Sequence, residues 1–362
     1  MKRLPTAARW KFLLPVLGAA ILLIASLQSV VGPYSAEPGS DERLTASAPV
    51  SDYVIVGNEV KRSDGSTAFE AEDFTAALQW AVAQDGKTVH VPAGTHKVED
   101  QIRPHSGVTL TGEGDGEDGT VLDFVRGSAS RSLILLSSGV NDVTLSGFRI
   151  TGHGSIRIDA FGVTCGGHQL QDVTAFRTSK SHPAAFWMLV LNKGVLDDVR
   201  FVGCKAVETE HIGFFCEGDG YSAPGGVKNT PDFSGWIKNL YLEDCLADHC
   251  GYYGRYNPWV VGFDLAESVN VENVKAVRCT ARYCWESGFH FEPSPAVKNA
   301  VLVDCVADHN GQKPDDFDNG DGTEGLWFGK GYYWAPGRTT VTLINCSGEG
   351  NANGLRPLAL PF

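Results

Sequence analysis

A short phrase of alternating apolar and polar residues recurs along the chain from about residue 105. Each copy reads apolar, any residue, apolar, any residue, and then a turn residue that is most often Gly, Asp or Asn. Eight copies follow one another at intervals of 26 to 41 residues, beginning at Val108, Val143, Val173, Val199, Leu240, Val274, Ala300 and Val341. A period of two predicts a strand with one buried face, and the turn residues favour a left-handed backbone. Each copy therefore predicts a strand that ends at a corner.

A second apolar segment follows the corner in most copies. These segments begin at Phe161, Phe186, Phe214, Phe263, Phe289 and Leu326. Repeats that contain strands and turns but no helix are typical of a stacked solenoid, in which only the stacking of coils buries the apolar faces. Ahead of the repeats, the spacing of apolar residues predicts an amphipathic helix over 73–84, and a helix there would cap the N-terminal end.

Two stretches of the sequence resemble a known superfamily. Residues 74–114 read FTAALQWAVAQDGKTVHVPAGTHKVEDQIRPHSGVTLTGEG, and this run resembles the N-terminal module of pectate-lyase-like proteins. The phrase NAVLVDCVADHNG, residues 299–311, resembles their repeats. The resemblance covers roughly residues 68–350 and implies an all-β fold, a single-stranded right-handed parallel β-helix with a short N-terminal capping helix. The superfamily includes lyases, hydrolases, epimerases and adhesins, so the resemblance leaves the activity open.

The N-terminus has the pattern of a targeting segment. Four basic residues lie within the first 11 positions, and residues 12–31 then carry no charge. This pattern predicts export, either by a cleaved signal peptide or by an uncleaved signal anchor, since twenty apolar residues can span a bilayer. We expect residues 1–32 to be that segment, residues 33–66 a linker and lead-in segment, and residues 67–362 the β-helix domain. The protein would be secreted, or anchored on the outer face of the membrane by residues 12–31.

The net charge of the chain is −13, from 30 basic and 43 acidic residues. A surface this acidic repels phosphate backbones, which excludes nucleic acid as a natural partner. We expect contact with a membrane only through the N-terminal segment.

Most of the nine cysteines recur at fixed positions of the repeat. Five form one column: Cys204, Cys245, Cys279, Cys305 and Cys346. Cys250 and Cys284 form a second column five residues later. Parallel side chains in stacked coils suit a disulfide badly, so the pattern favours buried free thiols, with a Cys250–Cys284 disulfide as the alternative. No cysteine pair has the spacing of a zinc site.

In the second strand, the residues between the apolar positions should point outward. They form a face that we take as the candidate functional surface. The first column on this face is Trp187, Phe215, Asp264, His290 and Trp327, and the next is Leu189, Glu217, Ala266, Glu292 and Gly329. Aromatic rings interleaved with acids suit sugars, and three insertions (219–236, 251–261 and 312–324) would wall a groove over this face. The predicted substrate-binding residues are Trp187, Phe215, Tyr253, Arg255, Tyr256, Trp259, Trp327 and Lys330.

The acids on this face suggest two kinds of sugar chemistry. Asp264 and His290 would lie in neighbouring coils, roughly 4.8 Å apart, as an acid–base dyad. Glu217 and Glu292 would lie two coils apart, roughly 9–10 Å, at the long end of the ~6.5–9.5 Å that inverting glycosidases use. A lyase would instead need a base and a cation for the uronate carboxylate. The candidate catalytic residues are Glu217, Asp264, His290 and Glu292; Arg255, Lys330 and His290 are the lyase candidates.

A loop rich in acids and glycines offers oxygen ligands to a cation. It has five carboxylates, of which the candidate ligands are Asp316, Asp318, Asp321 and Glu324. Calcium binds such ligands, although their spacing fits no EF-hand. The alternatives are a calcium site and a plain acidic loop with no cofactor at all.

Two functions from different classes therefore remain. The first is an exported carbohydrate-active enzyme that cleaves a polysaccharide, as a glycoside hydrolase or as a polysaccharide lyase. The second is a non-enzymatic protein of the cell surface or envelope that binds glycans. The two differ in their need for the carboxylates, because a binding module needs aromatic side chains but no acid–base pair.

Overall fold

The computed structural model describes residues 51–126, 131–179, 183–218, 234–251, 260–292, 296–312, 329–334 and 341–356. The segment 12–31 lies outside these residues. Among the helices that are described, none is long and apolar enough to span a membrane.

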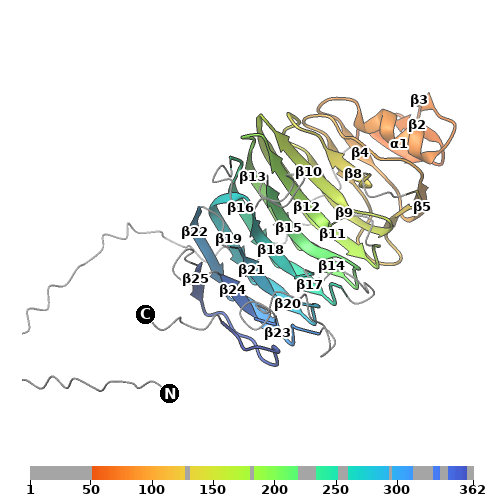
Figure 1. The fold of residues 1–362 in the computed structure, drawn as a ribbon. Coiled ribbons are helices and arrows are strands. Elements are labelled where there is room, and N and C mark those ends of the chain that lie inside the picture. The colour runs from red at the N-terminus through yellow and green to blue at the C-terminus, as the bar shows by residue number, and fades with distance from the viewer. Residues whose placement is uncertain are drawn as a thin grey trace, which may run out of the picture. The chain divides into compact units, whose positions relative to one another are not determined.

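The described chain winds through three ladders of parallel strands (Figure 1). The first ladder consists of β4 (Thr88–His90), β6 (Thr109–Thr111), the start of β9 (Thr144–Gly152), the middle of β11 (Thr164–Phe176), β13 (Val195–Val202), β16 (Trp236–Glu243), β19 (Asn270–Val277), β22 (Val297–Val303) and β25 (Val341–Ile344). The second consists of β5 (Gly94–Val98), β7 (Thr120–Phe124), the ends of β9 and β11, β14 (Lys205–Val207), β17 (Leu246–Asp248), β20 (Thr280–Arg282) and β23 (Val306–Asp308).

The third ladder is a separate seven-stranded sheet. It consists of β8 (Ile134–Leu136), β10 (Ile156–Phe161), β12 (Ala184–Leu191), β15 (Ile212–Gly218), β18 (Phe263–Glu267), β21 (Phe289–Phe291) and β24 (Tyr332–Trp334). Each coil visits the three ladders in this order, and the next coil pairs with it in parallel register. The structure is therefore a right-handed parallel β-helix, as expected.

A helix and a small antiparallel sheet precede the first coil. Helix α1 (Phe74–Val82) begins where the Asp73 carboxylate accepts a hydrogen bond from the Ala76 amide at 2.8 Å. Strands β1 (Tyr53–Val56), β2 (Glu59–Arg62) and β3 (Thr67–Glu70) pair in antiparallel order, and β1 also extends the first ladder beside β4. Because α1 buries its apolar side, it covers the end of the core, in agreement with the predicted capping helix.

Left-handed residues mark the corner between the first and second ladders. Asp244, Arg278, Asp304 and Asn345 all have φ of 51° to 52°, in agreement with the repeat phrase. The copy assigned to Val173 was wrong by five residues. Leu170 pairs with Leu145 and with Phe201, so the corner in this coil is Asp172, with φ of 50°. Pattern matching missed it because the true phrase begins with His168, where the other copies have an apolar residue.

Stacked side chains fill the core at the same position of successive coils. Phe186, Phe214, Phe263, Phe289 and Tyr332 of the third ladder are stacked, with neighbouring ring centroids 4.6 to 5.2 Å apart. All five are fully buried. Aromatic stacking of this kind adds to the large area that each ring removes from water.

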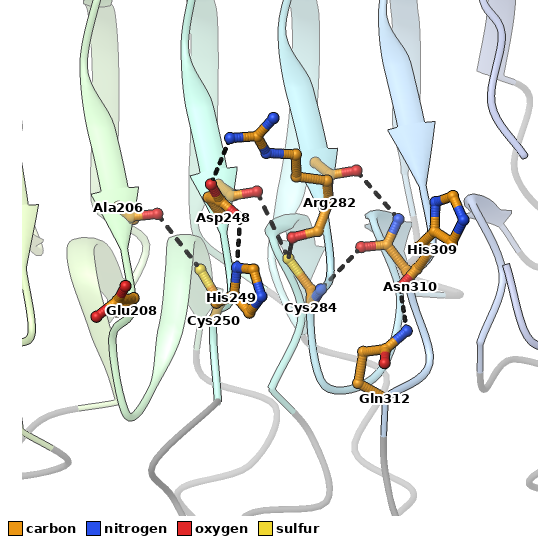
Figure 2. A network of polar contacts seen from close by, with 12 residues as sticks. Ala206, Glu208, Asp248, His249, Cys250, Arg282, Cys284, His309, Asn310 and Gln312 are labelled. Atoms are coloured by element: carbon orange, nitrogen blue, oxygen red, sulfur yellow. Dashed lines mark hydrogen bonds and ion pairs between the residues drawn. The ribbon is translucent and has the colours of Figure 1, made fainter. Parts of the chain in front are cut away.

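The cysteine columns contain free thiols. All nine cysteines are unpaired with one another, and only Cys346 is not fully buried. Each thiol of the second column donates to a carbonyl of the preceding coil, Cys250 to Ala206 at 3.8 Å and Cys284 to Ala247 at 3.7 Å (Figure 2). Asn310 continues this column and donates to the Ala281 carbonyl. The favoured interpretation is confirmed, and the Cys250–Cys284 disulfide is not formed.

Two Asp-His pairs, Asp248-His249 and Asp308-His309, recur at the next corner of the coil. His249 and His309 have φ of 54° and 51°, and Figure 2 shows both beside the second column. One oxygen of the Asp248 carboxylate lies 2.6 Å from the His249 Nδ1. The other oxygen accepts a hydrogen bond from the Arg282 guanidinium at 2.7 Å. The contact between Asp248 and Arg282 connects adjacent coils, so we assign the Asp248-His249 pair a structural role.

The thiol state can be counted directly. Thiol titration of the denatured, unreduced protein should find all nine sulfhydryls, because no cysteine forms a disulfide bond. Titration of the native protein should modify at most Cys346, since burial protects the others. A denatured count of seven or fewer would contradict the geometry of the columns.

Candidate functional site

The outward positions of the third ladder form one in-register column. It runs through Arg157, Trp187, Phe215, Asp264, His290 and Tyr333. Trp187, Phe215, Asp264 and His290 are therefore adjacent, as the alternation predicts. The place predicted for Trp327 is taken by Tyr333 in β24, and Trp327 lies outside the described residues.

The second outward column differs from its prediction at one coil. Leu189 pairs with Glu217 as expected, but a bulge between Phe215 and Glu217 shifts the register, so Glu217 faces Glu267. The prediction of Ala266 at this position was wrong, because a bulge adds a residue to one strand and re-aims the side chains beyond it. Glu292 follows directly after β21, and its amide donates to the Ala266 carbonyl at 3.2 Å.

The expectation that this face is open to solvent was wrong. The exposed fraction is 8% for Trp187, 5% for Asp264 and 3% for His290. Neighbours in the column cover one another: the Arg157 guanidinium lies 4.7 Å from the Trp187 ring centroid, and the Tyr333 ring lies 4.6 Å from that of His290. Strands about 4.8 Å apart leave little room for water between large side chains.

A cavity of about 240 Å³ opens where the two columns meet. Its described lining consists of Pro183, Ile212, Phe215, Glu217, Val261, Asp264, Glu267, Glu286, His290 and Glu292. All four candidate catalytic residues are thus in one cavity, together with Phe215. Two acids that the sequence analysis missed, Glu267 and Glu286, join them.

His290 lies between two carboxylates. Its Nε2 is 3.0 Å from the Glu292 Oε1, and its Nδ1 is 3.3 Å from the Glu286 Oε1. Burial by itself would lower the pKa of His290, but the two carboxylates raise it well above its usual value. At neutral pH the ring is therefore an imidazolium that holds Glu292 in place.

Asp264 and Glu292 are shifted in opposite directions. Burial raises the pKa of Asp264 to about 8, against the opposing charge of His290, and its Oδ1 has no hydrogen-bond partner. Burial would also raise the pKa of Glu292, but its hydrogen bond to His290 and the charge of that ring lower it. At neutral pH Asp264 is a neutral acid and Glu292 is a carboxylate. Such a pair can donate one proton and accept another.

In the three remaining acids of the cavity, burial outweighs the contacts that favour the ionised form. The Trp187 indole donates to the Glu217 carboxylate at 2.9 Å, yet burial still raises the pKa of Glu217. Burial also raises the pKa of Glu286, and it raises that of Glu267 well above the usual value. The charge of Arg157 offsets the burial of Glu217 only in part, and both the Nε and the Nη2 of Arg157 are bound to the Asp159 carboxylate, at 2.6 and 2.7 Å.

Comparison with known proteins found solved structures that are similar to this chain, but no similar family or curated sequence. No family model and no curated protein matches the sequence. A surface adhesin of Streptococcus pneumoniae is 11% identical, with 79% of this chain and 75% of that chain covered and a TM-score of 0.43. A pectate lyase is 14% identical over 80% and 77%, with a TM-score of 0.38. The A-module of a mannuronan C-5 epimerase of Azotobacter vinelandii is 14% identical over 80% and 95%, with a TM-score of 0.34.

The coiled path through three parallel ladders, with a helix at the N-terminal end, matches the resemblance noted in residues 74–114. This fold agrees with the right-handed parallel β-helix that the resemblance implies. These comparisons support no activity, because the TM-scores are below 0.5 and the identities are low.

Several of the predicted site residues do not take part in the described cavity. Lys330 is buried and donates its Nζ proton to the Asn353 carbonyl, and burial lowers its pKa. Tyr253, Arg255, Tyr256 and Trp259 lie outside the described residues, and so do the calcium candidates Asp316, Asp318, Asp321 and Glu324. Within the described part of the chain, no group of His, Cys, Asp and Glu side chains could hold a metal ion.

Glu286 and Glu267 were missed for different reasons. Glu286 lies in the turn before β21, outside the alternation on which the columns were built. The sequence offers one signal for it. Glu286 is a charged residue in a segment with Cys284, Trp285 and Gly288, which are residue types that are often buried. Glu267 was missed because the bulge cannot be read from a regular alternation.

The burial of Asp264 predicts a pH-dependent stability. Its folded pKa of about 8 lies above the unfolded value of about 3.9, so its contribution is complete below pH ~4 and is lost as the pH rises through about 8. Asp264→Asn mimics the neutral acid and avoids this loss. Between these limits, the variant should gain about 1.4 kcal/mol of unfolding free energy over the wild type per pH unit.

Denaturant unfolding at a series of pH values measures this difference. Asp304→Asn, which removes an exposed carboxyl at a corner, should run parallel to the wild type. Parallel curves for Asp264→Asn as well would show that Asp264 is ionised in the folded state.

Proposed function

We propose that this chain is an exported carbohydrate-active β-helix protein that cleaves a polysaccharide as a glycoside hydrolase. The observation that carries the proposal is the pairing of a neutral Asp264 with an ionised Glu292 in one cavity. Titratable groups whose environments separate their pKa values are typical of acid–base catalysis. Export rests on the pattern of residues 1–32.

The proposed reaction uses the two carboxyl groups from opposite sides of the sugar. Asp264 donates its proton to the glycosidic oxygen as the bond to the anomeric carbon breaks. Glu292 takes a proton from a water molecule, whose oxygen bonds to that carbon. The products are two sugar chain ends, and proton exchange with solvent returns Asp264 and Glu292 to their starting states. His290 keeps Glu292 ionised and oriented before the reaction.

The register of the strands gives the spacing that this reaction needs. Asp264 is opposite His290, and Glu292 is two residues further along the chain. With strands about 4.8 Å apart and a rise of about 3.3 Å per residue, the backbone positions of Asp264 and Glu292 are roughly 8 Å apart, which allows a similar separation of the two carboxyl groups that line the cavity. Inverting glycosidases separate their carboxyl groups by ~6.5–9.5 Å to leave room for water. The proposed stereochemical outcome is therefore inversion.

The state of His290 favours hydrolysis over elimination. A lyase needs an unprotonated base and a cation for the substrate carboxylate. His290 is held as an imidazolium by Glu286 and Glu292, and Lys330 donates to a backbone carbonyl away from the cavity lining. Arg255 lies outside the described residues.

A glycan-binding surface protein is the weaker alternative. A buried carboxyl oxygen without a hydrogen-bond partner costs folding free energy, and a module that only binds has no use for it. Of the aromatic residues in the outward column, Phe215 is the one that lines the described cavity. The acid–base cluster is thus better explained by catalysis than by adhesion.

Replacement of either catalytic carboxyl should abolish turnover while the fold survives. We expect Asp264→Asn and Glu292→Gln each to lower kcat by about 10²- to 10⁴-fold, because each removes an acid or a base. Reducing-sugar release on a polysaccharide that the wild type cleaves measures the loss, with circular dichroism as the check on folding. Asp304→Asn should keep full activity. Full activity in both cavity variants would exclude this mechanism.

The pH profile of the wild type tests the same assignment. The rate should fall as the pH rises through about 8, where Asp264 loses its proton, and again at acid pH below the usual range of Glu, where Glu292 becomes protonated. The groups that face this pair are Glu217, Glu267, Glu286 and His290. Measurement of kcat/KM across the pH range checks both limbs. A rate that keeps rising above the pKa of Asp264 would exclude it as the acid.

A further inference from the structure

The described lining of the cavity has many more acidic than basic side chains. Its described lining carries five carboxyl groups, and His290 is the one cationic side chain among them. The other lining residues, Pro183, Ile212, Phe215 and Val261, are apolar. Asp264 is 5% exposed, and its Oδ1 has no hydrogen-bond partner.

The cationic side chains described near the cavity already contact carboxylates of this chain. His290 is held between Glu286 and Glu292, at 3.3 and 3.0 Å. Arg157 gives two hydrogen bonds to Asp159 and lies over the Trp187 ring. A substrate carboxylate or sulfate would therefore enter a poorly hydrated, acidic space in which no described side chain is available to pair with it.

We infer that the sugar residue bound in this cavity carries no acidic group, and that the substrate is a polymer of neutral or amino sugars. This inference rests on the proposed function. Sugar hydroxyl groups can donate to the carboxylates, and an ammonium group would find a carboxylate partner. An acidic sugar would bring a negative charge beside the Glu292 carboxylate, with no described cation free to pair with it, which strongly disfavours binding.

Matched oligosaccharides that differ only in charge provide the test. The series is cello-, chitosan- and cellourono-oligosaccharides, which share one β-1,4 linkage, with β-1,4-mannan and polymannuronan fragments as a further matched pair. Calorimetry measures binding and reducing-sugar release measures cleavage. We expect neutral or amino members to bind roughly tenfold or more tightly than their acidic counterparts, and cleavage to be confined to them.

A cation placed in the cavity should reverse the discrimination. Glu267→Lys should strengthen binding of the acidic oligosaccharides by roughly tenfold, and Glu267→Gln should shift it in the same direction by less. Glu272→Lys makes the same change of charge outside the cavity, where Glu272 pairs with Lys238, and should leave the preference unchanged. Glu267→Gln keeps the test available if the lysine variant does not fold.

The outcomes separate this inference from the proposed function. Binding and cleavage of an acidic member as good as those of its neutral counterpart would overturn the inference and leave the hydrolase standing. Selective binding of neutral or amino members without any cleavage would overturn the hydrolase and support the inference. Failure to bind any member would overturn both.

Discussion

Everything in this structure depends on the stacking of identical positions in successive coils. A single coil has too few apolar side chains to exclude water, so each residue of the core is buried by its counterparts above and below. The stack from Phe186 to Tyr332 shows this constraint, since every ring packs on the ring of the next coil. The capping helix α1 and strand β1 serve the same requirement where the stack would otherwise end in solvent.

The same register that stacks the core also concentrates polar side chains. An acid placed at an outward position of β18 lies next to the corresponding residue of β21, with the two strands about 4.8 Å apart. Asp264, His290 and the neighbouring glutamates are therefore close enough to exclude water from one another and to shift one another's pKa values. A rigid sheet holds them in this arrangement before any ligand arrives, and such preorganisation is what acid–base chemistry needs.

One irregularity gives the site its shape. The bulge in β15 and β18 breaks the regular pairing after Phe215 and places Glu267 opposite Glu217. Bulges often occur beside active sites, because they re-aim a side chain without disturbing the remaining ladder. In this protein the bulge adds a carboxyl group to the cavity, and the excess of acids that results underlies the inferred preference for sugars without acidic groups.

The period of the repeat, the cysteine columns and the corner residues, except the corner at Asp172, were determined by the sequence alone. They depend on local alternation and on left-handed turn residues such as Asp244 and Asn345, which repeat from coil to coil. The membership of Asp264, His290 and Glu292 in one outward face followed from the same alternation. Only the tertiary structure decided that Asp264 is buried, that Glu286 reaches His290, and that Glu267 replaces Ala266 beside Glu217. Burial depends on the volume of neighbouring coils, and a bulge depends on how two strands pair, and neither property is encoded in the pattern of a single segment.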